Sequence, residues 1–211
     1  MDNFQELLSK KEPLRKELKK YEGKHNGMQV VRHPLVYSVP HHESFNALLN
    51  KRYETIKKEC DKALMEKDYG KFIFWHERPY RLDAFVQNMN FMSDKEYWKI
   101  LGEIWIDSEN IWQNLSKWKK LLSDKRASKH LFMISDDYKI PEKITAYRGY
   151  APNQNENGIS YTLDKNKAEW FAKRYWKKNG EVKEITITKN KVFAYISTRD
   201  EKKLSSFNLF E

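Results

Sequence analysis

Two histidine-containing motifs have the residue types of a metal site, but neither has the complete spacing of one. His76 and Glu77 begin like the His-Glu-x-x-His helix of zinc proteases, in which two histidines four residues apart bind the metal. Tyr80 stands where the second histidine would be, so the motif predicts no zinc site. The run His-His-Glu at 41–43 follows a proline and is predicted to be an exposed turn, with adventitious metal binding as the alternative.

Other common catalytic signatures are missing from the sequence. It has no G-x-x-x-x-G-K-[ST] phosphate loop, no G-x-G-x-x-G turn and no G-x-S-x-G nucleophile elbow. Cys60 is the single cysteine, which excludes an intramolecular disulfide and a multi-cysteine metal site and is typical of a reducing compartment. Because Cys60 lies on the apolar face of a predicted helix, we expect a small core residue and not a nucleophile.

A third group of candidate residues lies in the last third of the chain. Arg148 ends a predicted strand, and a polar, glycine-containing loop follows at 150–157. Ser160 and Thr162 alternate on the next predicted strand, and the chain later reaches the acidic residue Glu201. The group therefore combines a guanidinium, two hydroxyls and a carboxylate, and a guanidinium is suited to bidentate contacts with phosphate.

The order of these motifs resembles the arginine–serine–glutamate class of ADP-ribosyltransferases, in particular small phage-associated proteins with that fold. The matching segments are YRG at 147–149, GISYT at 158–162, KAEWFA at 167–172 and AYISTRDE at 194–201. The segments HERPYR (76–81) and WIDSENIW (105–112) are also similar to parts of such proteins. The resemblance thus covers roughly residues 60–201.

In that class the substrate is NAD, and the resemblance assigns roles to individual residues here. Arg148, with Gly149 beside it, would contact the phosphates or the ribose. Ser160 would brace the site through hydrogen bonds, with Thr162 supporting it. Tyr161 would lie near the nicotinamide ring, although strand alternation equally allows it to point into the core.

Glu201 is the candidate catalytic carboxylate. The glycosidic bond of NAD breaks through an oxocarbenium-like state, which a negative charge stabilises. The usual acidic motif of the class is Glu-x-Glu or Gln-x-Glu with the second glutamate catalytic, whereas this chain has Lys203 at that position. Either Glu201 acts in a shifted register or the site is inactive; a charged turn is the structural alternative.

Two functions follow from the resemblance. The first is an NAD-dependent mono-ADP-ribosyltransferase that modifies a host macromolecule in a phage or bacterial setting. The alternative is a catalytically inactive protein of the same fold that binds and inhibits a protein partner or binds nucleic acid. Lys203 and the net charge favour the alternative.

The charge is large but evenly spread. The 211 residues include 40 Lys and Arg against 30 Asp and Glu, a formal net charge of +10. Many lysines alternate with acidic residues, as in 10–24 and 50–68, which is typical of solvated helix faces and leaves nucleic-acid binding as the alternative. We expect neither a membrane span nor a secretory signal, and hence a cytoplasmic protein, in the host cytoplasm if phage-encoded.

Helix signals dominate the middle of the chain. Ser44 is a predicted N-cap, Ser93 with Glu96 is a predicted capping box, and Asp107 or Ser108 is predicted to start a helix that runs to about 122. Trp98, Trp105, Trp112 and Trp118 are predicted to pack in the core, with a ligand-stacking ladder as the alternative. In HERPYR, ion pairs between Glu77 and the arginines are predicted in preference to an anion site.

After Pro141 the sequence no longer has a mainly helical pattern and instead predicts the order strand, strand, helix, strand, strand. We therefore predict an α+β protein, with a helical N-terminal portion packed on a split-sheet ADP-ribosyltransferase-like core. The expected segments are an N-terminal arm and extended segment (1–43), a helical region (44–139) and the α+β core (140–211), with one integrated domain as the alternative.

Overall fold

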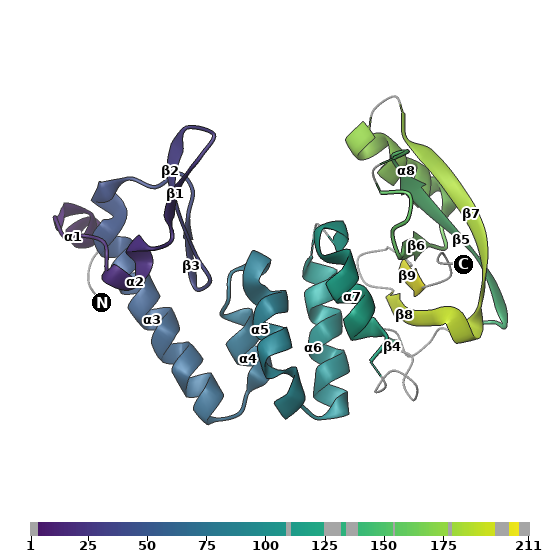
Figure 1. Cartoon of the computed structure of the whole chain (residues 1–211), viewed down its shortest axis with the longest axis horizontal. Helices are drawn as coiled ribbons and strands as arrows, with labels where there is room; N and C mark the ends of the chain where they lie inside the picture. Colours follow the sequence, from purple (N-terminus) through teal and green to yellow (C-terminus); the bar gives the residue numbers. More distant parts are fainter. Residues whose placement is uncertain are drawn as a thin grey trace. The chain divides into compact units, whose positions relative to one another are not determined.

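The computed structural model describes residues 4–108, 111–124, 132–133, 139–153, 155–176, 179–196 and 203–206. The chain divides into two compact units, Met1–Ser108 and Glu109–Glu211 (Figure 1). This division differs from the three segments expected from the sequence, because residues 1–43 belong to the same unit as the helices that follow them. The protein is mixed α and β, as predicted.

The N-terminal unit combines a small sheet with helices. Its elements are α1 (Phe4–Ser9), α2 (Lys16–Lys19), β1 (Glu22–His25), β2 (Met28–His33), β3 (Val36–Ser38), α3 (Asn46–Met65), α4 (Tyr69–Phe74), α5 (Arg81–Asn88) and α6 (Asp94–Asp107). The three strands form an antiparallel meander in the order β1-β2-β3. Asn26 and Gly27, both with positive φ, turn β1 into β2, and Pro34 lies in the turn between β2 and β3 and not within a strand.

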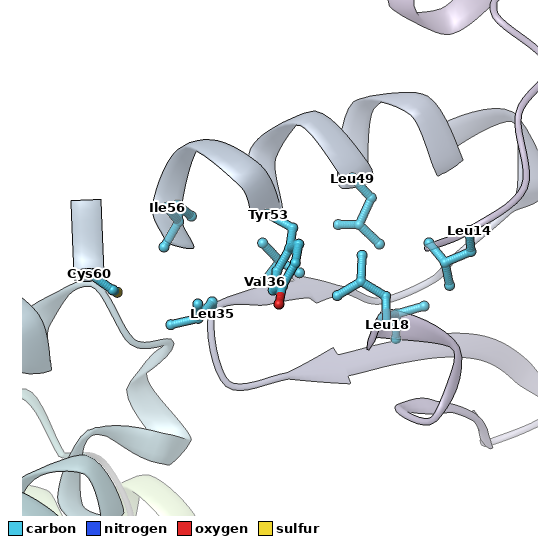
Figure 2. Close-up of a cluster of buried hydrophobic side chains, with 9 residues drawn as sticks. Leu14, Leu18, Leu35, Val36, Leu49, Tyr53, Ile56 and Cys60 are labelled. Atoms are coloured by element: carbon cyan, nitrogen blue, oxygen red, sulfur yellow. The ribbon is translucent and has the colours of Figure 1, made fainter. Parts of the chain in front are cut away.

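The core of the N-terminal unit lies between α3 and the segments before it. Figure 2 shows side chains of α3 facing others from the β2–β3 hairpin and from the N-terminal segment. The labelled residues are Leu14, Leu18, Leu35, Val36, Leu49, Tyr53, Ile56 and Cys60. The predicted apolar face of this helix is confirmed at its centre, whereas Phe45 and Leu64 at its two ends are exposed. Burial raises the pKa of the Cys60 thiol to about 11, which fits the predicted core role.

Two buried asparagines fix the N-terminal segment to α3. The side-chain amide of Asn50 donates to the Pro13 carbonyl at 3.0 Å and accepts from the Arg15 amide at 3.0 Å. Asn46 donates to the Glu12 carbonyl at 3.1 Å. The sequence predicts one charged helix over 4–21 interrupted at Pro13; the structure instead has two short helices joined by a segment that α3 binds.

The start of α3 also differs from the prediction. Residues 43–45 form a 3₁₀ turn, and the side chain of His42 caps it by accepting from the Ser44 amide. Ser44 is therefore inside the turn and not the N-cap. His41, predicted to be exposed, is buried, and its Nε2 lies 3.1 Å from the Asn46 Oδ1. His41 can be buried although it follows a proline, because its ring has a hydrogen-bond partner in the buried Asn46 side chain.

The C-terminal unit is built around a six-stranded sheet. Its elements are α7 (Leu115–Leu122), β4 (Phe132–Met133), β5 (Lys143–Tyr150), β6 (Ser160–Thr162), α8 (Lys165–Trp176), β7 (Glu181–Thr188), β8 (Val192–Ile196) and β9 (Lys203–Ser206). The strand order is β4-β8-β9-β6-β5-β7, with β4 parallel to β8 and the other pairs antiparallel. The predicted order is present as β5, β6, α8, β7 and β8, whereas the sequence does not predict β4 or β9.

Helix α8 packs very closely on this sheet (Figure 1). A Cβ at Gly149 of β5 would lie 2.0 Å from the Ala168 carbonyl oxygen and 2.6 Å from the Ala172 amide nitrogen. Those neighbours are backbone atoms of α8 and cannot swing aside, so only glycine fits on the strand. The sequence predicts that Asp164 caps this helix, and the Asp164 carboxylate accepts hydrogen bonds from the Asn166 and Lys167 amides at its start.

Several local predictions in the helical region are confirmed. Ser93 and Glu96 form the capping box at the start of α6. Trp98, Trp105 and Trp118 are buried, as expected for core packing, while the Trp112 side chain lies outside the described part of the structure. Asp107, predicted to open a helix, is instead the last residue of α6. No helix among the described residues is both long enough and apolar enough to cross a membrane.

His33 is a buried histidine that ends β2. Its Nδ1 accepts a hydrogen bond from the Leu35 amide at 3.0 Å, and its ring makes edge contacts with Tyr21 and Tyr53, with centroids 4.5 and 5.0 Å away. Burial, helped by the nearby positive charge of Lys20 and by His76, lowers the pKa of His33 from 6.5 to about 4. The folded protein therefore holds this imidazole neutral.

We predict that the N-terminal unit loses stability as the pH falls from about 6.5 to about 4, because the unfolded chain then protonates His33 and the folded chain does not. The stabilisation is complete above pH 6.5 and its loss amounts to about 2–3 kcal/mol. His33→Asn keeps an acceptor near Nδ1 without a titrating group, so its unfolding free energy in urea should vary less with pH. His25→Asn, on exposed β1, is the control; an unchanged pH slope in His33→Asn contradicts the prediction.

Candidate functional site

Arg148 connects β5 to the loop and strand that follow it. Its Nη2 donates to the Asn155 carbonyl at 2.7 Å, and its Nε donates to the same oxygen at 3.3 Å. Its Nη1 donates to the Ser160 carbonyl at 2.7 Å. Because β5 and β6 share a single register pair, Tyr147 with Thr162, these hydrogen bonds supply much of the connection between the two strands.

The loop closes tightly around the guanidinium. The Asn155 side chain accepts from the Ala151 amide at 2.8 Å, and the Gly158 amide donates to the Asn155 carbonyl at 3.2 Å. A Cβ at Gly158 would lie 2.0 Å from the Arg148 Nη2, so the side chain of any other residue there would displace the arginine. The sequence places Arg148 and this loop together but does not reveal that the arginine holds the loop.

The Arg148 guanidinium is held by backbone carbonyls. Burial lowers the pKa of its guanidinium, although an arginine stays protonated in any ordinary buffer. Its hydrogen-bond acceptors are backbone carbonyls, and within the described residues no carboxylate pairs with it.

Ser160 and Thr162 lie where the alternation predicts, on the strand next to Arg148. Ser160 is half-buried, and Thr162 is buried with its Oγ1 accepting from the Asp164 amide at 3.2 Å. Thr162 thus supports the turn that leads into α8. Gly149, a predicted ligand contact, is needed for the close approach of α8 to the sheet.

Tyr161 takes the core orientation that the alternation also allows. It is 2% exposed and packs with Ile144, Ile187 and Tyr195 in the core of the C-terminal unit. Its hydroxyl is buried and has no hydrogen-bond partner among the described residues. Burial raises the pKa of the phenol to about 12, opposed by the positive charge of Arg148.

Glu201 lies outside the described residues, but the strand that follows it, β9, pairs with both β6 and β8. Lys203 opens β9, where it pairs with Thr162 on one side and Ile196 on the other. Strand β9 therefore lies directly beside the Ser160–Thr162 strand. The charged-turn alternative does not hold for Lys203, which is in a strand; the other residues of that segment are outside the described part.

The HERPYR segment is a structural junction within the N-terminal unit. Arg81 pairs with Asp107 and also donates to the His76 carbonyl at 2.9 Å. Arg78 reaches the second carboxylate oxygen of Asp107 at 3.1 Å. Ion pairing is confirmed here, but Glu77 pairs with Arg52 of α3 at 2.9 Å and not with the arginines of its own segment.

The WIDSENIW segment contributes its aspartate to that junction. Asp107 is the last residue of α6, and it joins the end of this helix to the start of α5 through Arg81. Glu109 and Asn110 lie outside the described residues. Near the junction, burial lowers the pKa of His76, whose Nδ1 lies 2.9 Å from the Phe72 carbonyl.

The described residues offer little for two other kinds of site. No group of three or more His, Cys, Asp or Glu side chains there could hold a metal ion. An open hollow of about 460 Å³ lies along α3, lined by charged residues of both signs and by Tyr53 and Met65. Several of these charges pair with one another, as in Lys57 with Asp61 at 2.5 Å, so the hollow offers no matched ligand chemistry.

No protein-family model, curated protein or solved structure matches this chain. The function proposed below is therefore inferred from the geometry around Arg148 and from the sequence resemblance.

We predict that Gly158→Ala expels the Arg148 guanidinium from the loop, because the new methyl group would overlap Nη2. Losing the hydrogen bonds to the Asn155 and Ser160 carbonyls should destabilise the C-terminal unit by about 2–4 kcal/mol, measured by urea unfolding. Gly23→Ala, where the nearest atom is 3.9 Å away, is the matched control in a strand. Equal effects of the two changes would show that the arginine does not hold the loop.

A second prediction concerns the buried phenol. Tyr161→Phe removes a hydroxyl that lacks a partner among the described residues. The variant should therefore have an unchanged or higher thermal midpoint, with a free energy of unfolding that increases by at most about 1 kcal/mol. Tyr80→Phe is the contrasting variant, because its hydroxyl donates to the Arg32 carbonyl at 2.6 Å and its loss should be destabilising. A clear loss of stability in Tyr161→Phe would reveal a partner for the hydroxyl.

Proposed function

We propose that the C-terminal unit binds NAD and acts as a mono-ADP-ribosyltransferase on a host macromolecule in a phage or bacterial setting. The observation that carries the proposal is the position of the Arg148 guanidinium, which backbone carbonyls hold between β5 and the Ser160 strand. The strand order supports it further. The arginine and serine segments are on adjacent strands, and β9, which follows the acidic segment in sequence, pairs with the serine strand.

Arg148 retains donors for an anion. A guanidinium has five N–H groups, and the hydrogen bonds to carbonyls take one from each of its three nitrogens. One N–H therefore remains on each Nη within the described structure. This fork matches two phosphate oxygens, so the arginine can hold the loop and contact the diphosphate of NAD together.

In the proposed reaction, the bond between the ribose C1′ and the nicotinamide nitrogen breaks, and its electron pair leaves with nicotinamide. A nucleophilic atom of the acceptor forms the new bond to C1′ and gives up its proton to solvent or base. The Glu201 carboxylate stabilises the positive charge that develops on the ribose. Ser160 braces the arginine side of the site.

We predict that Glu201→Gln lowers the rate of nicotinamide release by about 10²–10³, because it keeps the size of the side chain and removes its charge. NAD affinity and the thermal midpoint should change little. Glu184→Gln, on exposed β7 of the same sheet, is the control for loss of one carboxylate. Arg148→Ala is a weaker test, because it also releases the loop.

Unchanged turnover in Glu201→Gln would remove this residue from the mechanism. Absence of NAD binding, of nicotinamide release and of transfer of labelled ADP-ribose to any lysate protein would contradict the enzymatic function as a whole.

One observation favours a second function, a catalytically inactive binding protein with the same fold. Lys203, which stands where the catalytic glutamate is expected, is the first residue of β9 and pairs with Thr162. A lysine there would repel the positive charge of an oxocarbenium-like state. Appearance of nicotinamide release in Lys203→Glu, from an inactive parent protein, would mark the parent as a lapsed enzyme, as this second function requires.

A further inference from the structure

We propose that the outward face of α8 binds single-stranded nucleic acid, with Trp170 as the surface on which a base stacks. This inference does not depend on NAD chemistry, since it concerns the helix face turned away from the sheet. Its starting point is the indole ring of Trp170, which is 46% exposed.

The packing of α8 fixes the direction in which Trp170 points. Ala168 and Ala172 are buried, and their backbones contact Gly149 of β5. Trp170 lies two residues from each alanine, and two residues correspond to about 200° around an α-helix. The tryptophan therefore lies on the face opposite the sheet, where the core gives no reason for a large aromatic side chain.

The residues that surround Trp170 on the helix surface are mainly cationic. The positions three and four residues away are Asn166, Lys167, Lys173 and Arg174, and none of them is acidic. The Lys167 Nζ lies 5.3 Å from the indole centroid and the Arg174 Cζ lies 4.8 Å from it. Phe171 makes an edge contact with the indole at 5.0 Å between centroids, which limits the rotation of the ring.

The composition of α8 differs from that of α3, another charged helix. Along α3, lysines pair with carboxylates one turn away, as Lys57 does with Asp61 and Lys62 with Glu66. Helix α8 has four basic residues and one acidic residue, a net charge of +3. Phe91, another exposed large ring, is stacked on Tyr69 with 6.4 Å between the ring centroids.

Lys167 and Arg174 lie over the Trp170 indole, so a base that stacks there takes the place of one of these cations on the ring face. The site then matches the chemistry of an unpaired nucleotide. The base offers a π-face to the indole, and the neighbouring phosphates offer charge to Lys167 and Arg174. In a duplex the base faces are already stacked on one another, so the indole has no surface to contact. The site therefore favours a single strand over a duplex.

The test measures binding of the full chain to a fluorescently labelled oligothymidylate of about 16 nucleotides by anisotropy, over a range of salt concentrations. Trp170→Ala should weaken binding about tenfold and leave the salt dependence unchanged, because stacking releases no counter-ions. Lys167→Ala with Arg174→Ala should instead reduce the slope of log K against log salt by about 1.4, or about 0.7 for each phosphate that the variant no longer neutralises. Trp170→Phe should retain most of the affinity.

Matched controls separate this site from diffuse attraction by a basic protein. Phe91→Ala removes an exposed ring elsewhere, and Lys51→Ala with Lys58→Ala removes two exposed lysines at the same seven-residue spacing on α3. The proposal is overturned if these controls weaken binding as much as the α8 variants do, if Trp170→Ala binds like the parent protein, or if no binding is seen. It is also overturned if a duplex of the same length binds equally well. Thermal midpoints of all variants identify any that fail to fold.

Discussion

The hydrogen bonds from the Arg148 guanidinium to the carbonyls of Asn155 and Ser160 join β5, β6 and the loop between them. Strands β5 and β6 share only one register pair, so this arginine supplies much of the connection between the two strands. The same cation lacks a carboxylate partner within the described residues. A structural role and a ligand-binding role are therefore compatible in one side chain, and the charge needed to hold the loop is also the charge that would attract an anion.

Local signals in the sequence predict the elements well, and long-range polar contacts explain where prediction fails. The capping box of Ser93 and Glu96 is complete within four residues, so it can be seen without the fold. The burial of His41 depends on Asn46, whose other contact is the backbone of Glu12, far away in the sequence. Asp107 is a residue type that often starts a helix, which is why the sequence predicts a helix start there. Its partner Arg81 lies on another helix, and the sequence around Asp107 gives no sign of this ion pair.

In the candidate site, too, the local features can be predicted from the sequence and the long-range contacts cannot. Alternation along a strand places Ser160 and Thr162 on one side and Tyr161 on the other, and the structure has Tyr161 in the core. The direction of the Arg148 side chain cannot be predicted, because its hydrogen-bond acceptors are backbone carbonyls. Every residue has a backbone carbonyl, so the sequence does not single out the ones that bind the arginine. The short strand β9 has no clear sequence signal, since its four residues, beginning at Lys203, carry no regular alternation of apolar and polar side chains.

The close approach of α8 to β5 has a consequence for how this protein can evolve. At Gly149 the backbones of the strand and the helix nearly touch, and Ala168 and Ala172 face that contact with the smallest side chain that retains a Cβ. Few substitutions are tolerated on this inner face, so its sequence should drift slowly. The outer face of α8 does not contact the sheet, so substitutions there do not disturb the packing of the helix on β5. Substitutions on the outer face of α8 can therefore change the charge and polarity of this surface while the scaffold stays the same.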